Sequence, residues 1–180
     1  MKGFRAVAAA AAAVAGVGAA VLAGVAPGLA AAAPAAVVVP PSLRVPAGNH
    51  LVITLHVIQG VQVYSCEKGA WVLLEPDANM GRSATGRPIV LYTAGPKWIS
   101  TVDGSAVTGM PLASVNEKGT IPDLLVKAIA NRGSGLFGHI DFIQRLATSG
   151  GLAPRGMCAD GTITASAYHA TERFWAKNKK

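Results

Sequence analysis

The stretch GHIDFIQRLATSGGLAPRGMC, residues 138–158, decides how the rest of the chain is organised. Its first half alternates as a β-strand does, a double glycine at residues 150–151 breaks the strand, and the stretch ends on Cys158. The only other cysteine, Cys66, closes a second strand-like run at residues 60–66. A bond between the two cysteines would therefore tie these two runs together.

Residues 1–36 are predicted to be a targeting segment outside the fold. Lys2 and Arg5 give a basic start, residues 6–26 are almost all Ala, Val, Leu and Gly, and small residues at 29–36 offer A-x-A cleavage sites. This order is typical of a secretory signal peptide, with cleavage at about 31–36. A retained transmembrane helix is the alternative, since the apolar run is long enough to span a bilayer. We expect cleavage, a secreted, extracellular protein and no stable membrane insertion.

Export bears directly on the two cysteines, because disulfides form and persist outside the cytosol. We therefore predict a Cys66–Cys158 disulfide, which in the loop-entropy account contributes on the order of 4–5 kcal/mol. Two reduced, buried thiols are the alternative. A metal site is not expected, because the cysteines lack C-x-x-C spacing and the histidines lack ligand spacing. The histidines are His50, His56, His139 and His169.

The charge of the chain does not indicate a nucleic-acid partner. There are 16 Lys and Arg against 9 Asp and Glu; without Lys2 and Arg5, 14 basic residues remain and the formal charge is +5. Part of this excess lies in a basic tail at residues 177–180. No other basic stripe interleaved with aromatic residues is present. The roughly 140 residues after the leader suit one domain.

Short strands separated by turns predict a mainly β protein, either an antiparallel β-sandwich or a partly closed barrel with one α-helix. Three prolines make residues 37–50 an extended segment that leads into a single β-rich domain at 51–176. Residues 76–86 are expected to be a loop. The helix is predicted at 121–131, because a capping box at Thr120 and Asp123 precedes apolar residues at helical spacing. The expected strands lie at 51–58, 61–66, 70–74, 88–93, 97–102, 106–109, 139–146 and 162–175.

Two strands carry polar residues on faces that are expected to point inward. Gln62 and Tyr64 share a face with Cys66, and Gln144 lies in register with Ile140 and Phe142. Buried polar groups need partners. They either form a satisfied internal network or line a polar pocket inside a barrel. The candidate pocket residues are Gln62, Tyr64, Trp98, Asp103, Gln144 and Arg145.

The run GSGLFG at residues 133–138 fits the dinucleotide fingerprint G-x-G-x-x-G. That fingerprint needs a strand before it and a helix after it, so that the pyrophosphate meets the helix N-terminus. Here the expected helix precedes the run and a strand follows it. We interpret the run as a turn, expect no cofactor, and exclude a NAD-dependent dehydrogenase.

Catalytic patterns are weak, and no catalytic residue is assigned. His139, Asp141 and Arg145 share one predicted strand face and could do acid–base chemistry, although a solvent-facing strand of mixed charge is commoner. No G-x-S-x-G elbow exists in the chain. We therefore expect a non-catalytic extracellular module that binds a small molecule or a glycan. A secreted enzyme, such as a hydrolase using Asp103, His139 or Arg145, and a structural envelope protein are the alternatives.

Ordered motifs along the chain resemble a secreted domain family of unknown function from bacteria and fungi. The resemblance covers about residues 51–175 and implies secretion and a β-rich domain, with no established activity. Some fungal members carry the label malate dehydrogenase. Members often have a histidine where LYT stands at residues 91–93, and another tyrosine near Glu172. The matching runs are GVQVYSC at 60–66, Trp71, EPDA at 75–78, GPKW at 95–98, DGS at 103–105, IP at 121–122, IQR at 143–145, TSGG at 148–151, AP at 153–154 and Cys158.

Overall fold

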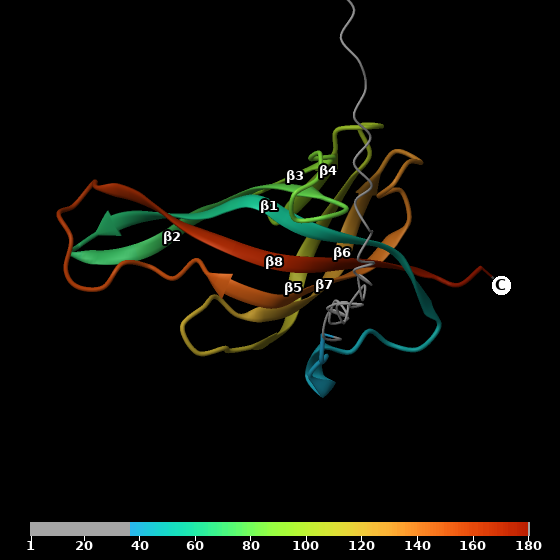
Figure 1. Cartoon of the computed structure of the whole chain (residues 1–180), viewed down its shortest axis with the longest axis horizontal. Helices are drawn as coiled ribbons and strands as arrows, with labels where there is room; N and C mark the ends of the chain where they lie inside the picture. The colour runs from blue at the N-terminus through green and yellow to red at the C-terminus, as the bar shows by residue number, and fades with distance from the viewer. Residues whose placement is uncertain (1–36, 180) are drawn as a thin grey trace, which may run out of the picture. The chain divides into compact units, whose positions relative to one another are not determined.

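Eight antiparallel strands follow one another in chain order and close into a barrel, with the last strand paired to the first (Figure 1). The structure is a computed structural model that describes residues 37–179. The sequence-based prediction of a mainly β, antiparallel fold is thereby confirmed, in its barrel form. The strands are β1 (Asn49–Glu67), β2 (Ala70–Gly81), β3 (Val90–Thr93), β4 (Lys97–Ser100), β5 (Ala106–Val115), β6 (Asp123–Arg132), β7 (Ile140–Gly150) and β8 (Ile163–Lys177), and a short 3-10 turn, η1 (Pro41–Leu43), precedes them.

The long β1–β2 hairpin is made by a two-residue turn. Lys68 and Gly69 both have positive φ, 54° and 77°, which is the backbone form that lets two twisted strands join tightly. The strands predicted at 51–58 and 61–66 are one strand, β1, which changes register against β8 between His56 and Val61. The loop expected at 76–86 is wrong in its first half, because β2 continues to Gly81 and pairs with β1 throughout.

The helix predicted at 121–131 is wrong: this part of the chain is β6, which pairs with β5 and β7. The cause is that β6 is apolar on both faces. Leu124 and Val126 pack into the barrel interior, whereas Leu125 packs on the outside beneath the N-terminal segment. Apolar residues on both faces hide the two-residue period of a strand and produce an accidental helical spacing.

The supposed helix cap has a different use. Asp123 accepts hydrogen bonds from the backbone N–H groups of Ala147 and Thr148 and from the Thr148 hydroxyl, at 3.0–3.2 Å. Ala147 has a positive φ of 52° at a point where β7 and β8 change register. The carboxylate that resembled an N-cap therefore holds a β-bulge.

Two apolar clusters lie on opposite sides of the barrel wall. The interior cluster forms the core of the barrel and includes Trp98, Ile143 and Phe174. The outer cluster lies between β6, β7 and the N-terminal segment, residues 37–50, whose Leu43 is fully buried. This segment thus covers one patch of the barrel wall.

The double glycine that ends β7 allows a close approach. Gly150 and Gly151 have φ of 75° and 78°. A Cβ at Gly151 would lie 3.0 Å from side-chain atoms of both Ile121 and Tyr168, so this position has no room for a side chain.

The predicted disulfide is present. Cys66, near the end of β1, is bonded to Cys158 in the connection between β7 and β8, with 5.9 Å between their Cα atoms. The predicted signal peptide lies outside the described residues. Between residues 37 and 179, no helix is long and apolar enough to cross a membrane.

Candidate ligand cavity

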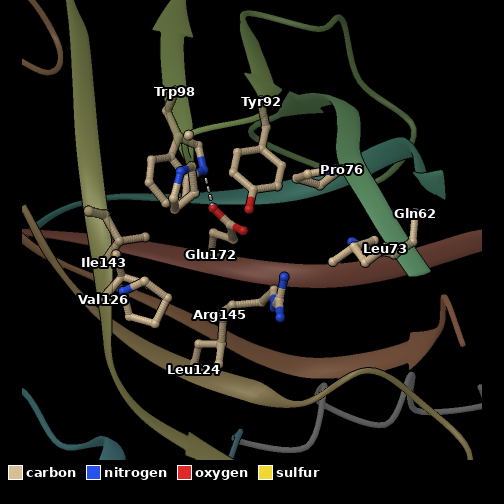
Figure 2. A pocket seen from close by; sticks show the side chains of 13 residues that line it. Gln62, Leu73, Pro76, Tyr92, Trp98, Leu124, Val126, Ile143, Arg145 and Glu172 are labelled. Carbon is tan, nitrogen blue, oxygen red and sulfur yellow. Dashed lines mark hydrogen bonds between the residues drawn. The ribbon is translucent and has the colours of Figure 1, made fainter. Parts of the chain in front are cut away.

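A cavity of about 230 Å³ lies inside the barrel, and all eight strands contribute residues to its lining (Figure 2). It opens to solvent at a rim where Leu73, Gly95 and Pro111 are exposed. Its inner wall is mostly apolar and aromatic, and three polar side chains, Gln62, Arg145 and Glu172, reach it. The other lining residues are Pro76, Tyr92, Pro96, Trp98, Leu124, Val126 and Ile143.

Glu172 is the carboxylate of this cavity. It alternates inward on β8 between Ala170 and Phe174 and is 1% exposed. The indole N–H of Trp98 donates to Oε2, and Oε1 has no hydrogen-bond partner among the described residues. Burial raises the pKa of Glu172 to about 7, although Arg145 and the Trp98 bond favour the charged form and lower it. The carboxyl group is therefore poised to gain or lose a proton near neutrality.

Arg145 stands opposite Glu172 in the register of β7 and β8. Its Nε and Nη2 both donate to the carbonyl oxygen of Pro122, at 3.3 and 3.0 Å. A guanidinium has five N–H donors. Across residues 37–179, the other three have no hydrogen-bond acceptor and no carboxylate lies within ion-pair distance of Arg145. A nearly buried cation thus keeps unused donors beside the cavity.

Further polar atoms in the barrel interior also lack partners. The Gln62 Nε2 amide and the Tyr168 hydroxyl are buried without a hydrogen bond to any residue that the structure describes. Tyr92 stacks on Trp98 with 4.8 Å between ring centroids, and Figure 2 shows its hydroxyl directed toward Glu172. Burial, and then the charge of Glu172, raises the pKa of Tyr92 and of Tyr168 above the ordinary value, so both hydroxyls keep their protons.

Of the six residues expected to form a pocket, the structure brings three together at this cavity: Gln62, Trp98 and Arg145. Tyr64 points inward but is occupied, because its hydroxyl donates to the Gly151 carbonyl at 2.6 Å. It fixes the double glycine against β1.

Gln144 faces the outside of the barrel. The bulge in β7 between Ile140 and Phe142 puts Ile140 and Ile143 inside, and leaves Phe142 and Gln144 outside. The Gln144 amide donates to the Leu43 carbonyl at 2.7 Å, and its oxygen accepts from the Trp175 indole at 2.9 Å. Both polar atoms of the Gln144 amide are therefore hydrogen-bonded, and the residue holds the N-terminal segment against the barrel.

Asp103 lies on the exposed turn between β4 and β5, away from the cavity. The hydroxyl of Ser105 and the backbone N–H groups of Leu136 and Ser105 donate to its carboxylate at 2.6–2.9 Å. These bonds hold the pKa of Asp103 well below its usual range. The carboxylate joins the β4–β5 turn to the connection between β6 and β7.

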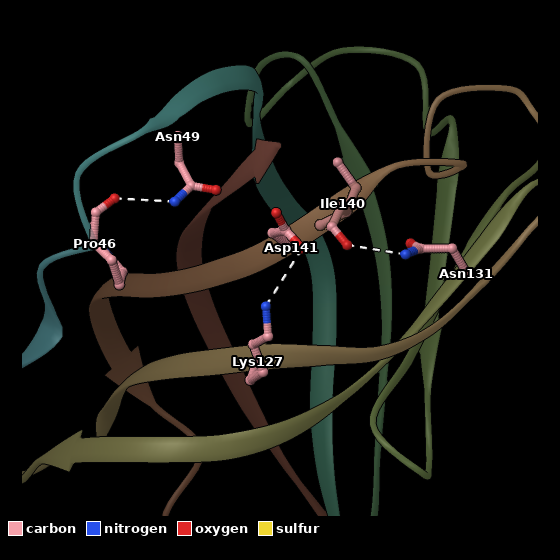
Figure 3. A network of polar contacts seen from close by, with 6 residues as sticks. All are labelled: Pro46, Asn49, Lys127, Asn131, Ile140 and Asp141. Atoms are coloured by element: carbon pink, nitrogen blue, oxygen red, sulfur yellow. Dashed lines mark hydrogen bonds and ion pairs between the residues drawn. The ribbon is translucent and has the colours of Figure 1, made fainter. Parts of the chain in front are cut away.

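The strand face considered for acid–base chemistry does not form one site. Arg145 lies inside the barrel, whereas Asp141 pairs with Lys127 at 3.3 Å on a half-exposed surface (Figure 3). His139 is exposed and lines a separate hollow with His50 and Lys177. The run at residues 133–138 connects two strands, β6 and β7, so no helix N-terminus follows it. In the described part of the chain, no three His, Cys, Asp or Glu residues are grouped to hold a metal ion.

The sequence reasoning missed Glu172 and Tyr92 as site residues. A signal existed for Glu172, which occupies an alternating position between Ala170 and Phe174 on a face that is otherwise apolar. A carboxylate at such a position is costly unless it has a task or a partner. Nothing comparable marked Tyr92, because an inward tyrosine is an ordinary core residue.

These features define a disulfide-bonded, closed antiparallel barrel with a small apolar cavity and an acidic and a basic side chain facing each other within it. The chain belongs to the DUF3455 family, proteins of unknown function, whose model matches residues 79–176. The matched part contains Trp98, Arg145 and Glu172, while Gln62 lies before it. No curated protein and no solved structure matches the chain.

Proposed function

We propose that this protein is a non-catalytic extracellular binding module that holds one small molecule in the barrel cavity. The observation that carries the proposal is a pair of buried polar atoms that have no partner among the described residues and belong to side chains lining the cavity: Glu172 Oε1 and Gln62 Nε2. Buried polar groups in folded proteins are nearly always hydrogen-bonded, and each unpaired one costs roughly 1–3 kcal/mol. A bound molecule that supplied the missing partners would recover that free energy.

The size of the cavity favours a small molecule over a glycan chain. Pockets for drug-sized ligands measure about 300–1,000 Å³, and this one measures about 230 Å³. Its aromatic and apolar wall suits a compact ligand with few polar groups. The predicted leader and the disulfide support an extracellular place of action.

A thermal-shift screen with a library of neutral, cationic, anionic and sugar fragments tests the proposal. A ligand at 100 times its Kd stabilises the native state by about 2.7 kcal/mol, which raises Tm by roughly 5–10 °C for a domain of this size. Binding should also change the fluorescence of Trp98, which lines the cavity.

Two neighbouring substitutions provide a matched control. Leu73 lines the mouth of the cavity and is 50% exposed, while Leu74, 54% exposed, does not line it. Leu73→Trp should block the mouth and abolish the shift, and Leu74→Trp should preserve it. A library with no hit, or hits equally insensitive to both variants, would contradict the proposal.

A further inference from the structure

Arg145 brings a positive charge to the cavity that no carboxylate of the described residues pairs with. Its side chain is 8% exposed, and a buried cation is expensive unless it is paired or fully hydrogen-bonded. Its two recorded hydrogen bonds go to one neutral carbonyl oxygen, that of Pro122. Gln62 brings a second unused donor, Nε2, to the same cavity. Two donors from β7 and β1 therefore line one cavity, where an acceptor could bind them, and the positive charge of Arg145 favours an anionic acceptor.

A carboxylate matches this arrangement better than a point anion does. The planar guanidinium presents parallel N–H groups that a carboxylate accepts in a two-pronged contact. The wall around it is apolar: Trp98 and Tyr92 form a stacked aromatic pair, and Val126 and Ile143 also line the cavity. The cavity therefore offers one charged end and one apolar body.

Glu172 limits the ligand to a single negative charge. It is the one carboxylate among the residues that line the cavity, and a second ligand carboxylate would meet either this group or the apolar wall. The groups that face Glu172 are Arg145 from β7, Tyr92 from β3, Trp98 from β4 and Tyr168 from β8 itself. When protonated, Glu172 does not repel an anion and has an O–H to donate.

We propose that the cavity binds a small monocarboxylate, with its carboxylate on Arg145 and Gln62 and its apolar body against Trp98 and Ile143. This inference rests on the proposed function and specifies its ligand class. At about 230 Å³ the cavity is smaller than the roughly 300–1,000 Å³ pockets that hold drug-sized ligands, so it suits a smaller molecule. Benzoate and hexanoate have this size and chemistry.

Isothermal titration calorimetry on the disulfide-bonded protein provides the test. The probes are benzoate and hexanoate, with benzyl alcohol, hexanol, hexylamine, succinate and glucose as matched alternatives. We expect the two monocarboxylates to bind at least tenfold more tightly than any of the others. We also expect Leu73→Trp to abolish their binding and Leu74→Trp to leave it unchanged.

Two variants test the assigned contacts. Gln62→Leu removes a donor that has no partner among residues 37–179, so the fold loses no recorded bond, and benzoate binding should weaken by roughly tenfold or more. Arg145→Lys keeps the positive charge but loses the two parallel N–H groups of the guanidinium, and it should weaken benzoate binding at least as much as Gln62→Leu does. If the Arg145→Lys variant does not fold, the benzoate affinity of Gln62→Leu alone tests the assigned contacts.

Proton linkage supplies an independent readout. Bound carboxylate favours the protonated form of Glu172, so benzoate should bind more weakly at pH 8 than at pH 6, and Glu172→Gln should remove most of that difference. Monocarboxylates that bind equally well to Leu73→Trp would place the site elsewhere and overturn the inference. Preferential binding of the alcohols or glucose, blocked by Leu73→Trp, would overturn the ligand class and leave the cavity function standing. If none of the probes binds and the fragment screen gives no hit, both the monocarboxylate inference and the proposed binding function are contradicted.

Discussion

Arg145 and Glu172 face each other across β7 and β8 inside the barrel, yet no ion pair joins them. Arg145 donates to the Pro122 carbonyl, and Glu172 accepts from the Trp98 indole. Each charge is thus held by a neutral neighbour. Both side chains line the cavity, and the titration of Glu172 gives a way to probe the environment inside it.

The first prediction concerns the pH dependence of folding stability. Glu172 has an ordinary pKa of 4.5, which burial raises to about 7 in the folded protein. Between these values the folded protein keeps a proton that the unfolded chain releases. The contribution of Glu172 to the free energy of unfolding is therefore largest below pH 4.5 and is lost as the pH rises to about 7, by on the order of 3 kcal/mol.

Glu172→Gln isolates this effect, because the amide oxygen still accepts from Trp98 and cannot ionise. Denaturant unfolding of both proteins at pH 5, 6, 7 and 8 should show the variant gaining on the parent protein as the pH rises. Parallel stability curves over this range would show that Glu172 titrates alike in the folded and unfolded states.

A second prediction compares two inward tyrosines. Tyr64→Phe removes the hydroxyl that donates to the Gly151 carbonyl. Since it leaves a buried acceptor unpaired, it should lower the free energy of unfolding by about 1–3 kcal/mol. The hydroxyl of Tyr168 has no partner in the described structure, so Tyr168→Phe should change stability by less than about 0.5 kcal/mol or raise it. Equal losses in urea unfolding would contradict the assignment of the Tyr64 bond.

The disulfide gives a third prediction. Intact mass before and after reduction and alkylation should show two protected thiols, which are those of Cys66 and Cys158. The double replacement of both cysteines by serine should destabilise the domain by roughly 2–5 kcal/mol, because the unfolded chain regains the freedom of a long loop. Alkylation of the native protein without a reductant would show that the bond is absent in solution.

The fourth prediction tests whether the N-terminal segment belongs to the fold. Leu43 is fully buried in the outer cluster, and its carbonyl accepts from Gln144, while Val38 is 86% exposed. Leu43→Ala should cost about 2–5 kcal/mol of stability, as large-to-small changes in cores do. Val38→Ala should cost almost nothing. A neutral Leu43→Ala in thermal unfolding would show that the segment is not docked.

Local patterns predicted most of the strands because most of them have one apolar and one polar face. In β1, the residues from Val61 to Cys66 alternate between half-buried and buried positions, as the two-residue period requires. The pattern failed in β6, where both faces are covered. In β7 it predicted the strand correctly but not which residues face inward, because a bulge reverses the alternation after Ile140. Neither the cover nor the bulge is encoded within the strand itself.

The candidate site was predictable only in part, because the β7 bulge changes which residues face inward. Gln62 was placed correctly on an inward face, because its strand alternates without interruption up to the disulfide. Gln144 and Arg145 are adjacent, so they necessarily point to opposite sides of the wall. The sequence suggested that Gln144 is the inward one, and the bulge between Ile140 and Phe142 makes it Arg145.

The sequence by itself determined the strand-rich class, the β1–β2 turn, the cysteine pair and the breaks at glycine, because these depend on neighbours along the chain. Tertiary structure decided which side chains of residues 138–158 face the interior of the barrel and which face its outer surface. Pairing of β8 with β7 brings Glu172 opposite Arg145, pairing of β8 with β1 closes the barrel around both, and the N-terminal segment covers Gln144 from the other side. Contacts between residues so distant in the chain form only when the strands that carry them are paired, and those contacts fix which polar groups have a partner among the described residues and which do not.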